Sequence, residues 1–473
     1  MGCCGPTNLP ALPRCATSGT GGQAGTVTTT EPSVREELFG PSHRAVTVGI
    51  VLTISLVAFE AMGVGTAMPA LVADLGSVET YAWPFVAFIA STVLGNVLTG
   101  RWCDAHGPRL PLLVGPLVFG AGLLLAGLSP TMAPLLVGRV LQGFAAGALG
   151  VGVYVLIAVV YTRRARPAVF ALLSASWVLP SLIGPPVAGF VTDRFSWHWV
   201  FLGLVPLVAV AVLLVLPAVA GLAPPEGDPP QARRGLVTAA AVSAVAVSVL
   251  TWAAEDPRGG RLLVVVGAVG VLGVALVRVF PTGTPRAGAG IGAVVAGRWL
   301  VSGAFFTANA YLPLTLTTTH GWSLTAAGAP LIVGSLGWSA ASAWQGRRPA
   351  LSRAALLRVG FALVAVGLAL LVPVTLGLVP WLAFLGLALS GAGMGLSYSS
   401  LSFLMLAHSE QQEVGFHSSS VQLADQMSQA VFVGLGGALL AVLVPTVALP
   451  ALVAGLVGLA VVGCGISPRT RET

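Results

Sequence analysis

The sequence alternates long apolar blocks with short polar segments along almost its whole length. A helix needs about 20 apolar residues to cross a hydrocarbon core of about 30 Å, and lipid offers an open backbone no hydrogen-bond partner. The blocks lie near residues 46–70, 80–100, 110–128, 132–160, 167–191, 198–220, 236–254, 261–280, 292–316, 325–346, 354–373, 379–406, 418–444 and 447–466. We therefore expect an all-α polytopic membrane protein with fourteen spans. A twelve-span topology that omits the pair at 236–280 also has an even number of spans, so it leaves both termini on the same side of the membrane.

The composition excludes a soluble globular protein. Only 8% of the 473 residues are charged, whereas a soluble domain is about 25% charged, and the mean hydropathy is +0.91. An isoelectric point near 9.7 would suggest nucleic-acid binding in a soluble protein. In a membrane chain the same positive excess sets the orientation, so we expect no nucleic-acid partner.

The positive charges are unevenly distributed, and all of them are arginines. With the first segment placed inside, nineteen arginines, Arg298 among them, fall on cytoplasmic segments and only Arg194, Arg258 and Arg261 fall on external ones. Cytoplasmic loops of membrane proteins carry such an excess. We expect a multi-pass protein of a bacterial plasma (inner) membrane with both termini in the cytoplasm.

Polar stretches divide the chain into six parts. The expected order is a disordered cytoplasmic tail, a six-helix bundle, a linker, two inserted helices, a second six-helix bundle and a short tail. Their boundaries are 1–44, 45–221, 222–235, 236–281, 292–466 and 467–473. The first tail is rich in Gly, Thr and Pro, which is a composition typical of disorder.

Of the sixteen acids, only Glu60 and Asp425 fall inside the apolar blocks, and we place one base, Arg139, at membrane depth with them. An ionisable group inside a membrane costs about 3 kcal/mol on insertion scales and is by default a functional hypothesis. From a rise of 1.5 Å per residue, Glu60 lies about 21 Å from the inner face and Arg139 about 10 Å from the outer face. The two therefore come to nearly the same depth, where they either form a pair or share a water-filled cavity. A permanent salt bridge that only fixes two helices is the alternative.

Asp425 belongs to a polar stripe with Gln422, Gln426 and Gln429, spaced as one helix face. This stripe predicts a hydrated cavity, and a position near an inner gate is equally consistent with it. Deep aromatic residues are candidates to line an apolar cavity, namely Trp177, Phe305, Phe306, Trp338 and Tyr398. The residues that we assign to the substrate cavity are Gln142, Trp177, Phe305, Asn309, Tyr398, Gln422 and Gln426.

The polar segment after the second block reads GRWCDAHGPR over residues 100–109. Two glycines permit a tight turn between helices, and an acid and a base provide charges for a switchable contact. This segment resembles the signature loop of the major facilitator superfamily, G-x-x-x-D-x-x-G-x-(R/K). Gly100, Asp104, Gly107 and Arg109 match that motif and are our candidates for a gating element.

Three further motifs of the same family occur in order. LLVGRVLQG at 135–143 is similar to L-x-x-x-R-x-x-Q-G and places Arg139 at the position that the family links with proton transfer. GPPVAG at 184–189 looks like the antiporter motif of exporters, with matches at Gly184, Pro185 and Gly189. WHWVF at 197–201 resembles the run that opens the sixth span of the fourteen-helix drug:proton antiporters.

The resemblance implies a fold and a set of roles. The fold would be two six-helix bundles related by pseudo-symmetry, with two additional central helices, and transport would proceed by rocking of the bundles around a central site. In those antiporters an acid precedes a proline by nine residues, as Glu60 precedes Pro69 here. We expect Glu60 to carry the proton, Arg139 to modulate it, and Asp425 to be a second coupling or cation-attracting site.

The function that the resemblance implies is export of amphipathic small molecules in exchange for protons, as in multidrug efflux and antibiotic resistance. We expect no cofactor beyond the proton gradient, no metal, and a monomer that has a small molecule, protons and the bilayer as partners. Two acids in a cavity are consistent with cationic amphiphiles, and a lipid, a siderophore or a secondary metabolite fits the sequence as well. A proton-coupled importer, an exporter of a specific lipid, siderophore or metabolite, and a non-transporting receptor are the alternatives. An enzyme is not expected, because H-E-x-x-H and paired intramembrane aspartates are absent from the sequence.

Overall fold

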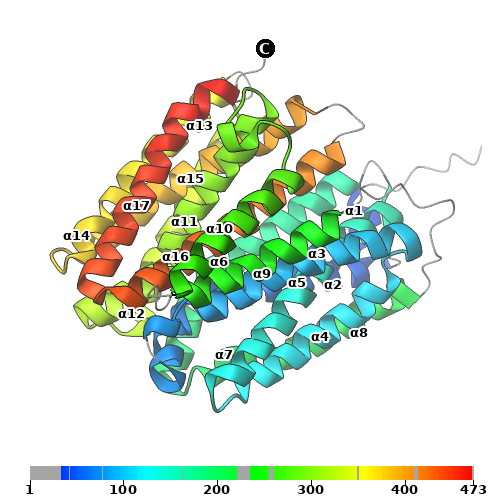
Figure 1. The fold of residues 1–473 in the computed structure, drawn as a ribbon. Helices are drawn as coiled ribbons and strands as arrows, with labels where there is room; N and C mark the ends of the chain where they lie inside the picture. The colour runs from blue at the N-terminus through cyan, green and yellow to red at the C-terminus, as the bar shows by residue number, and fades with distance from the viewer. Residues whose placement is uncertain are drawn as a thin grey trace, which may run out of the picture.

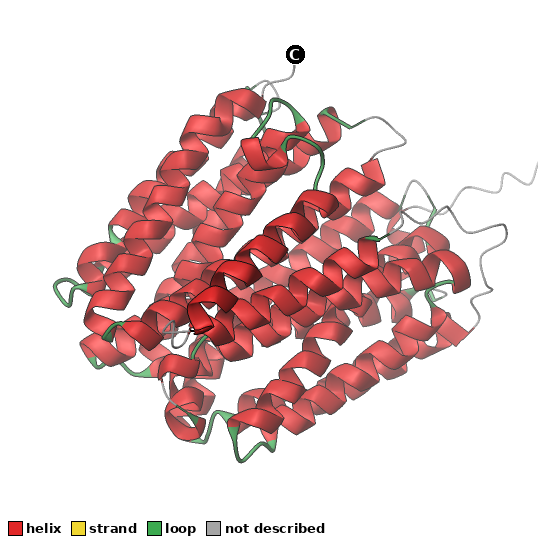
Figure 2. Ribbon diagram, viewed as in Figure 1, coloured by secondary structure: helices red, strands yellow, loops and turns green. Residues whose placement is uncertain are grey.

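The computed structural model describes residues 34–41, 43–76, 78–162, 165–220, 235–254, 260–348, 351–409 and 414–470. Every regular element in these ranges is a helix (Figure 2). The long helices are α2 (Arg44–Leu75), α3 (Trp83–His106), α4 (Arg109–Gly127), α5 (Met132–Val160), α6 (Arg166–Arg194), α8 (Val205–Ala220), α9 (Leu236–Ala254), α10 (Gly260–Val279), α11 (Ile291–His320), α12 (Leu324–Gly346), α13 (Arg353–Ala369), α15 (Leu382–Ala407), α16 (Val414–Val442) and α17 (Pro445–Ile466). The short ones are α1 (Val34–Phe39), α7 (His198–Leu202), α14 (Leu371–Thr375), and the 3₁₀ turns η1 (Val78–Thr80), η2 (Thr284–Arg286) and η3 (Ser467–Thr470).

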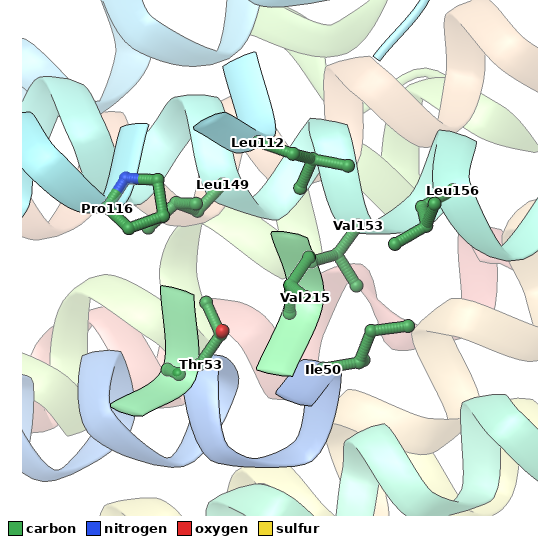
Figure 3. A pocket seen from close by; sticks show the side chains of 9 residues that line it. Ile50, Thr53, Leu112, Pro116, Leu149, Val153, Leu156 and Val215 are labelled. Carbon is green, nitrogen blue, oxygen red and sulfur yellow. The ribbon is translucent and has the colours of Figure 1, made fainter. Parts of the chain in front are cut away.

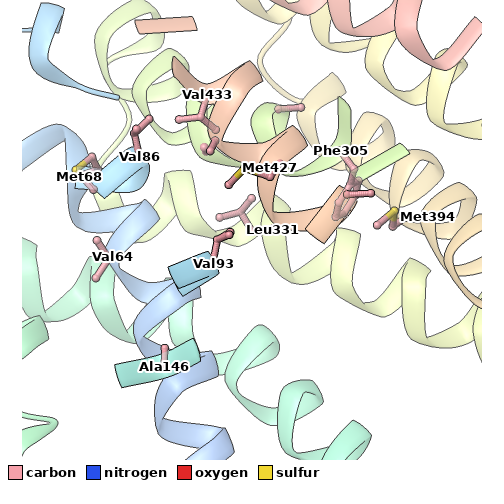
Figure 4. Close-up of a cluster of buried hydrophobic side chains, with 14 of the residues drawn as sticks. Val64, Met68, Val86, Val93, Ala146, Phe305, Leu331, Met394, Met427 and Val433 are labelled. Carbon is pink, nitrogen blue, oxygen red and sulfur yellow. The ribbon is translucent and has the colours of Figure 1, made fainter. Parts of the chain in front are cut away.

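The helices form two bundles with a helical hairpin between them (Figure 1). In the N-terminal bundle α5 packs against α3 and α4, and α2 packs against α6 and α8. In the C-terminal bundle α15 packs against α12 and α13, and α11 packs against α16. Helix α9 contacts α3 of one bundle and α16 of the other, while α10 packs against α9. Buried apolar side chains of both bundles form one cluster (Figure 4).

Glycines allow the closest helix contacts within each bundle. A Cβ atom at Gly143 of α5 would meet the backbone carbonyl of Phe88 in α3, and one at Gly391 of α15 would meet that of Gly334 in α12. In lipid, where no hydrophobic force drives helices together, such close backbone approach supplies the packing energy. The bundles are therefore held by small residues at specific positions.

The number of spans is confirmed only in part. Eleven of the described helices are long and apolar enough to cross a membrane. The apolar stretches of α9 and α10, Val237–Ala253 and Leu263–Arg278, are shorter, and α6 is not among the eleven. The chain is thus a multi-pass membrane protein, and the count of fourteen spans stays a prediction.

The two predicted tails are partly ordered. Residues 34–39, expected to be disordered, form α1 because Leu38 is buried and Glu37 accepts hydrogen bonds from the backbone N–H and the hydroxyl of Thr162, at 2.8 and 2.9 Å. At the other end η3 buries Ser467 and Thr470. Most of the linker predicted at 222–235 lies outside the described residues.

Candidate transport site

Glu60 and Arg139 form a buried ion pair between α2 and α5. Glu60 is fully buried and Arg139 is 2% exposed. The Arg139 Nη1 donates to Glu60 Oε1 and to Gln142 Oε1, and its Nε donates to the carbonyl of Pro84 at 3.0 Å. Of the two arrangements that the similar depths allow, a pair or a shared water-filled cavity, the structure has the direct pair.

The Glu60 carboxylate is only half satisfied. Its Oε2 is buried and has no hydrogen-bond partner among the described residues. A buried carboxylate oxygen without a donor is costly while it is ionised. Among the described residues, the ionised Glu60 carboxylate is therefore balanced by Arg139 alone, and a proton or a water at Oε2 would relieve the cost.

Gln142 belongs to this pair and not to a cavity wall. Its side chain is fully buried, it accepts from Arg139, and its Nε2 donates to the carbonyl of Gly122 at 2.9 Å. Both ends of the amide are therefore engaged within the protein, one by Arg139 and the other by Gly122, which does not fit the predicted place of Gln142 in the substrate cavity.

Asp425 also has an arginine partner, which the sequence analysis missed. Arg298 Nε donates to Asp425 Oδ1 at 2.8 Å, and Arg298 is 3% exposed. The arginine distribution places Arg298 on a cytoplasmic segment, but in the structure it lies seven residues inside α11, about 10 Å from the start of that helix. The signal was present in the sequence, because residue 298 falls within the apolar block predicted at 292–316.

Three donors surround the Asp425 carboxylate. Ser302, one turn from Arg298, donates its hydroxyl to Oδ1, and the Tyr398 hydroxyl donates to Oδ2 at 2.9 Å. Arg298 is held in turn by the carbonyl of Tyr398 at 3.0 Å. Unlike Glu60, Asp425 therefore has both carboxylate oxygens satisfied and its charge compensated by Arg298. Its role as a second coupling or cation-attracting site stays a prediction.

Four aromatic rings adjoin this second pair. Phe305 and Phe306 of α11 lie 5.7 and 6.0 Å from the ring of Trp338 in α12, and Trp338 lies 5.2 Å from Tyr398 of α15, measured between ring centroids. We call Phe305, Phe306, Trp338 and Tyr398 the aromatic cluster. Trp177 is not part of it and is 43% exposed on α6.

The remaining predicted cavity residues are dispersed. Asn309 is partly exposed on α11 and donates to the carbonyl of Phe305 at 2.8 Å. Gln426 accepts a 3.0 Å hydrogen bond from Asn96 of α3, so it joins the two bundles. Gln422 is exposed on α16.

The two bundles are joined at the end where α6 ends and α12 begins, which we call the outer end. There Tyr81 donates to the carbonyl of Ala310 at 2.7 Å and its ring lies 5.1 Å from that of Tyr311. Burial raises the pKa of Tyr81 far above its ordinary value, so its hydroxyl remains a donor. Asp193 of α6 accepts from the backbone N–H groups of Leu324 and Thr325 at 3.3 and 3.0 Å.

The antiporter motif lies at the same junction. A Cβ atom at Gly189 would approach the carbonyl carbon and oxygen of Leu324 to 2.7 Å, and one at Gly328 of α12 would approach the backbone of Pro185 to 3.0 Å. Gly184 has only ordinary contacts with α2. Pro185 lies inside helix α6, and through Pro185 and Gly189 the motif packs against the first turns of α12.

Of the two glycines expected to permit the tight turn, Gly107 lies in the turn and Gly100 lies inside α3. Gly107 has φ of +78°, a conformation that favours glycine, and it links α3 to α4. Arg109 is exposed, and Gly100 has open space beside it. The side chain of Asp104 lies outside the described residues, so a contact with Arg109 is not tested.

Two cavities lie away from these groups. One, of about 10 Å³, is lined by side chains of α2, α4, α5 and α8 that are apolar except for Thr53 (Figure 3). This volume is at the lower limit for a single water. The other, of about 490 Å³, is an apolar groove between α9 and α10. Neither includes a residue predicted for the substrate cavity.

Comparison with known proteins identifies the family. Residues 50–433 match the family model described as Major Facilitator Superfamily. The chain belongs to this superfamily. Membership makes it a transporter and not an enzyme.

Relatives and solved structures agree with this placement. An uncharacterized MFS-type transporter of Mycobacterium tuberculosis is 31% identical over 75% of this chain and 53% of its own length, so the chain spans about half of that relative. Multidrug resistance protein 3 of Bacillus subtilis is 31% identical over 37% of this chain and 34% of its own length.

A crystal structure of a POT family transporter in complex with a thioalcohol-conjugated peptide has a TM-score of 0.69 and 15% identity, and covers 93% of this chain and 100% of its own. A bacterial homologue of the human lysosomal transporter Spinster, solved inward-facing and unoccupied, has a TM-score of 0.63, 13% identity and coverage of 90% and 98%. These likenesses show the transporter fold.

Proposed function

We propose that the chain exports amphipathic small molecules in exchange for protons, with Glu60 as the proton carrier. The observation that carries the proposal is the buried pair in which Glu60 has one oxygen on Arg139 and the other without a partner. Protonation removes the charge that holds Arg139, so the pair opens. Release of the proton restores it. A group with these two states is what coupling to a proton gradient requires.

Substrate and direction rest on further observations. Partial matches to multidrug proteins of Bacillus subtilis favour amphipathic compounds. The hydrogen-bonded contacts at the outer end describe a carrier closed on that side, which the arginine distribution predicts to be external. An exporter loads its substrate in this state. The fourteen-helix count, the plasma-membrane location and the cytoplasmic termini belong to the same proposal.

Purified protein in proteoliposomes tests the proposal. We expect an imposed pH gradient to drive uptake of an amphipathic dye in the direction opposite to the proton, and Glu60→Gln to abolish this uptake without lowering the amount of folded protein. Glu60→Asp keeps the carboxylate and should retain part of the flux. Glu37→Gln, the same change outside the membrane, is the matched control.

Two outcomes would reject the assignment. Coupled uptake in Glu60→Gln at the level of Glu37→Gln would show that another group carries the proton. Dye movement in the same direction as the proton would identify an importer.

A further inference from the structure

The aromatic cluster lies on the side of the C-terminal bundle that faces the N-terminal bundle. Phe306 lies one turn from Ala310, whose carbonyl accepts from Tyr81, and Trp338 lies one turn from Ser335, whose hydroxyl reaches the carbonyl of Ser181 in α6 at 3.5 Å. Residues one turn apart share a helix face. These two rings therefore point toward the space between the bundles.

The aromatic cluster lies farther from the outer end than the hydrogen bonds that join the two bundles. Helix α11 runs toward the outer end and Phe306 precedes Ala310 by four residues, while α12 runs away from it and Trp338 follows Ser335 by three. Phe306, Trp338 and Tyr398 each remain partly exposed, although their rings touch one another. They therefore present ring surface that the protein itself does not cover.

The charges beside the cluster cancel. Asp425 carries one negative charge and Arg298 one positive charge, and they are joined by a 2.8 Å hydrogen bond. The Tyr398 hydroxyl is used by Asp425, and the Arg298 guanidinium lies over the Tyr398 ring. A ligand at the cluster meets aromatic faces and a neutral pair, so within the part of the chain that the structure describes a positive charge on the ligand finds no unpaired carboxylate beside the cluster.

We infer that the aromatic cluster is the substrate subsite, that it selects compounds with aromatic rings by stacking on Trp338, and that it does not require a positive charge. This inference rests on the proposed function and names its substrate class. It replaces the cationic amphiphiles that two cavity acids had suggested. Aromatic pairs prefer offset or edge-on contacts, which a ring entering beside Trp338 would add to those already present.

Equilibrium binding of three matched, radiolabelled probes tests this inference without any pH gradient. The probes are methyltriphenylphosphonium, a cation with three rings; triphenylphosphine oxide, its neutral counterpart; and methyltributylphosphonium, a cation without rings. Binding is measured to the full chain in lipid nanodiscs, with binding to empty nanodiscs subtracted. We expect the first two to bind within about threefold of each other and the third at least about tenfold more weakly.

Tryptophan variants locate the site. Trp338→Leu should weaken both aromatic probes about tenfold and Trp338→Phe by less. Trp344→Leu is the control, because Trp344 lies on the same helix, is 42% exposed and has Arg348 over its ring. If Trp338→Leu does not fold, the three probes on the unchanged chain and Trp338→Phe still decide the question.

Two results would overturn the inference: binding of the phosphonium more than tenfold tighter than that of the phosphine oxide, or equal effects of the substitutions at Trp338 and Trp344. If the probes bind as expected but the protein shows no proton-coupled flux, the proposed function is rejected and the aromatic binding site is retained. Coupled flux of a dye that is insensitive to Trp338→Leu would reject the subsite and leave the function.

Discussion

Asp193, in the last turn of α6, accepts a 2.7 Å hydrogen bond from the hydroxyl of Thr325 in the first turn of α12. An acid is unfavourable at the C-terminus of its own helix and favourable at the N-terminus of another. Asp193 therefore gains its stabilisation from the opposite bundle. The contact exists only while the outer end is closed, so it biases the carrier toward the closed state.

Removal of this contact should open the outer end. The groups are solvent-exposed, so we expect Asp193→Ala to shift the balance toward the open state by about 1 kcal/mol, or about fivefold. Spin labels at Phe195 and Trp381, which are 72% and 68% exposed, report the separation of the bundles as a distance distribution.

The control for that experiment removes a cap within one helix. Ser323 accepts from the backbone N–H of Ala326 at 3.2 Å and does not join the bundles, so Ser323→Ala should lower stability without lengthening the distances. Equal lengthening in both variants would contradict a specific role for Asp193.

Removal of one charge from the Arg298–Asp425 pair should lower the stability of the protein more than removal of both charges. Arg298→Met leaves Asp425 buried without a counter-charge, and loss of one partner of a buried pair costs about 3–5 kcal/mol. The double variant Arg298→Met with Asp425→Asn removes both charges and should recover most of that loss. The midpoint of heat-induced aggregation in detergent measures both, and a double variant no more stable than Arg298→Met would refute the pairing.

Glycines at close helix contacts should tolerate an added methyl group less well than glycines with open space beside them. At Gly143 a methyl group would meet the Phe88 carbonyl and the Ser91 hydroxyl, so Gly143→Ala should destabilise the protein by about 1–3 kcal/mol. At Gly455 of α17 nothing lies within 4 Å of the added atom, and Gly455→Ala should be neutral or stabilising by up to about 1 kcal/mol. A comparison of melting midpoints checks this, and equal losses at the two positions would argue against the contact.

The helices and one buried ion pair could be predicted from the sequence, because each rests on a local pattern. Block length gives each helix, and the 1.5 Å rise brings Glu60 and Arg139 to one depth. Arg298 was missed because the arginine count assigned each residue to the nearer loop, and nothing local shows that Arg298 turns toward a helix more than 100 residues away. The half-satisfied carboxylate of Glu60 also depends on packing that no pattern encodes.

Cavity residues were the least predictable. Polar and aromatic residue types predicted seven of them, but Gln142 is used by Arg139, Gln426 joins Asn96, and Trp177 lies apart on α6. Which face of a helix meets the other bundle depends on tertiary contacts between distant segments. The position of a residue within its apolar block gives its depth in the membrane, but residue type does not show whether its side chain lines a cavity.

The central claim is that Glu60 carries the proton that is exchanged for substrate. Proteoliposomes that are loaded with an exported aromatic dye and contain a trapped pH indicator test it directly. When dye leaves the liposomes, the interior should become more acidic with the unchanged protein and with Glu37→Gln, and should stay constant with Glu60→Gln. Acidification by Glu60→Gln equal to that of the unchanged protein, or alkalinisation by the unchanged protein, would contradict the claim.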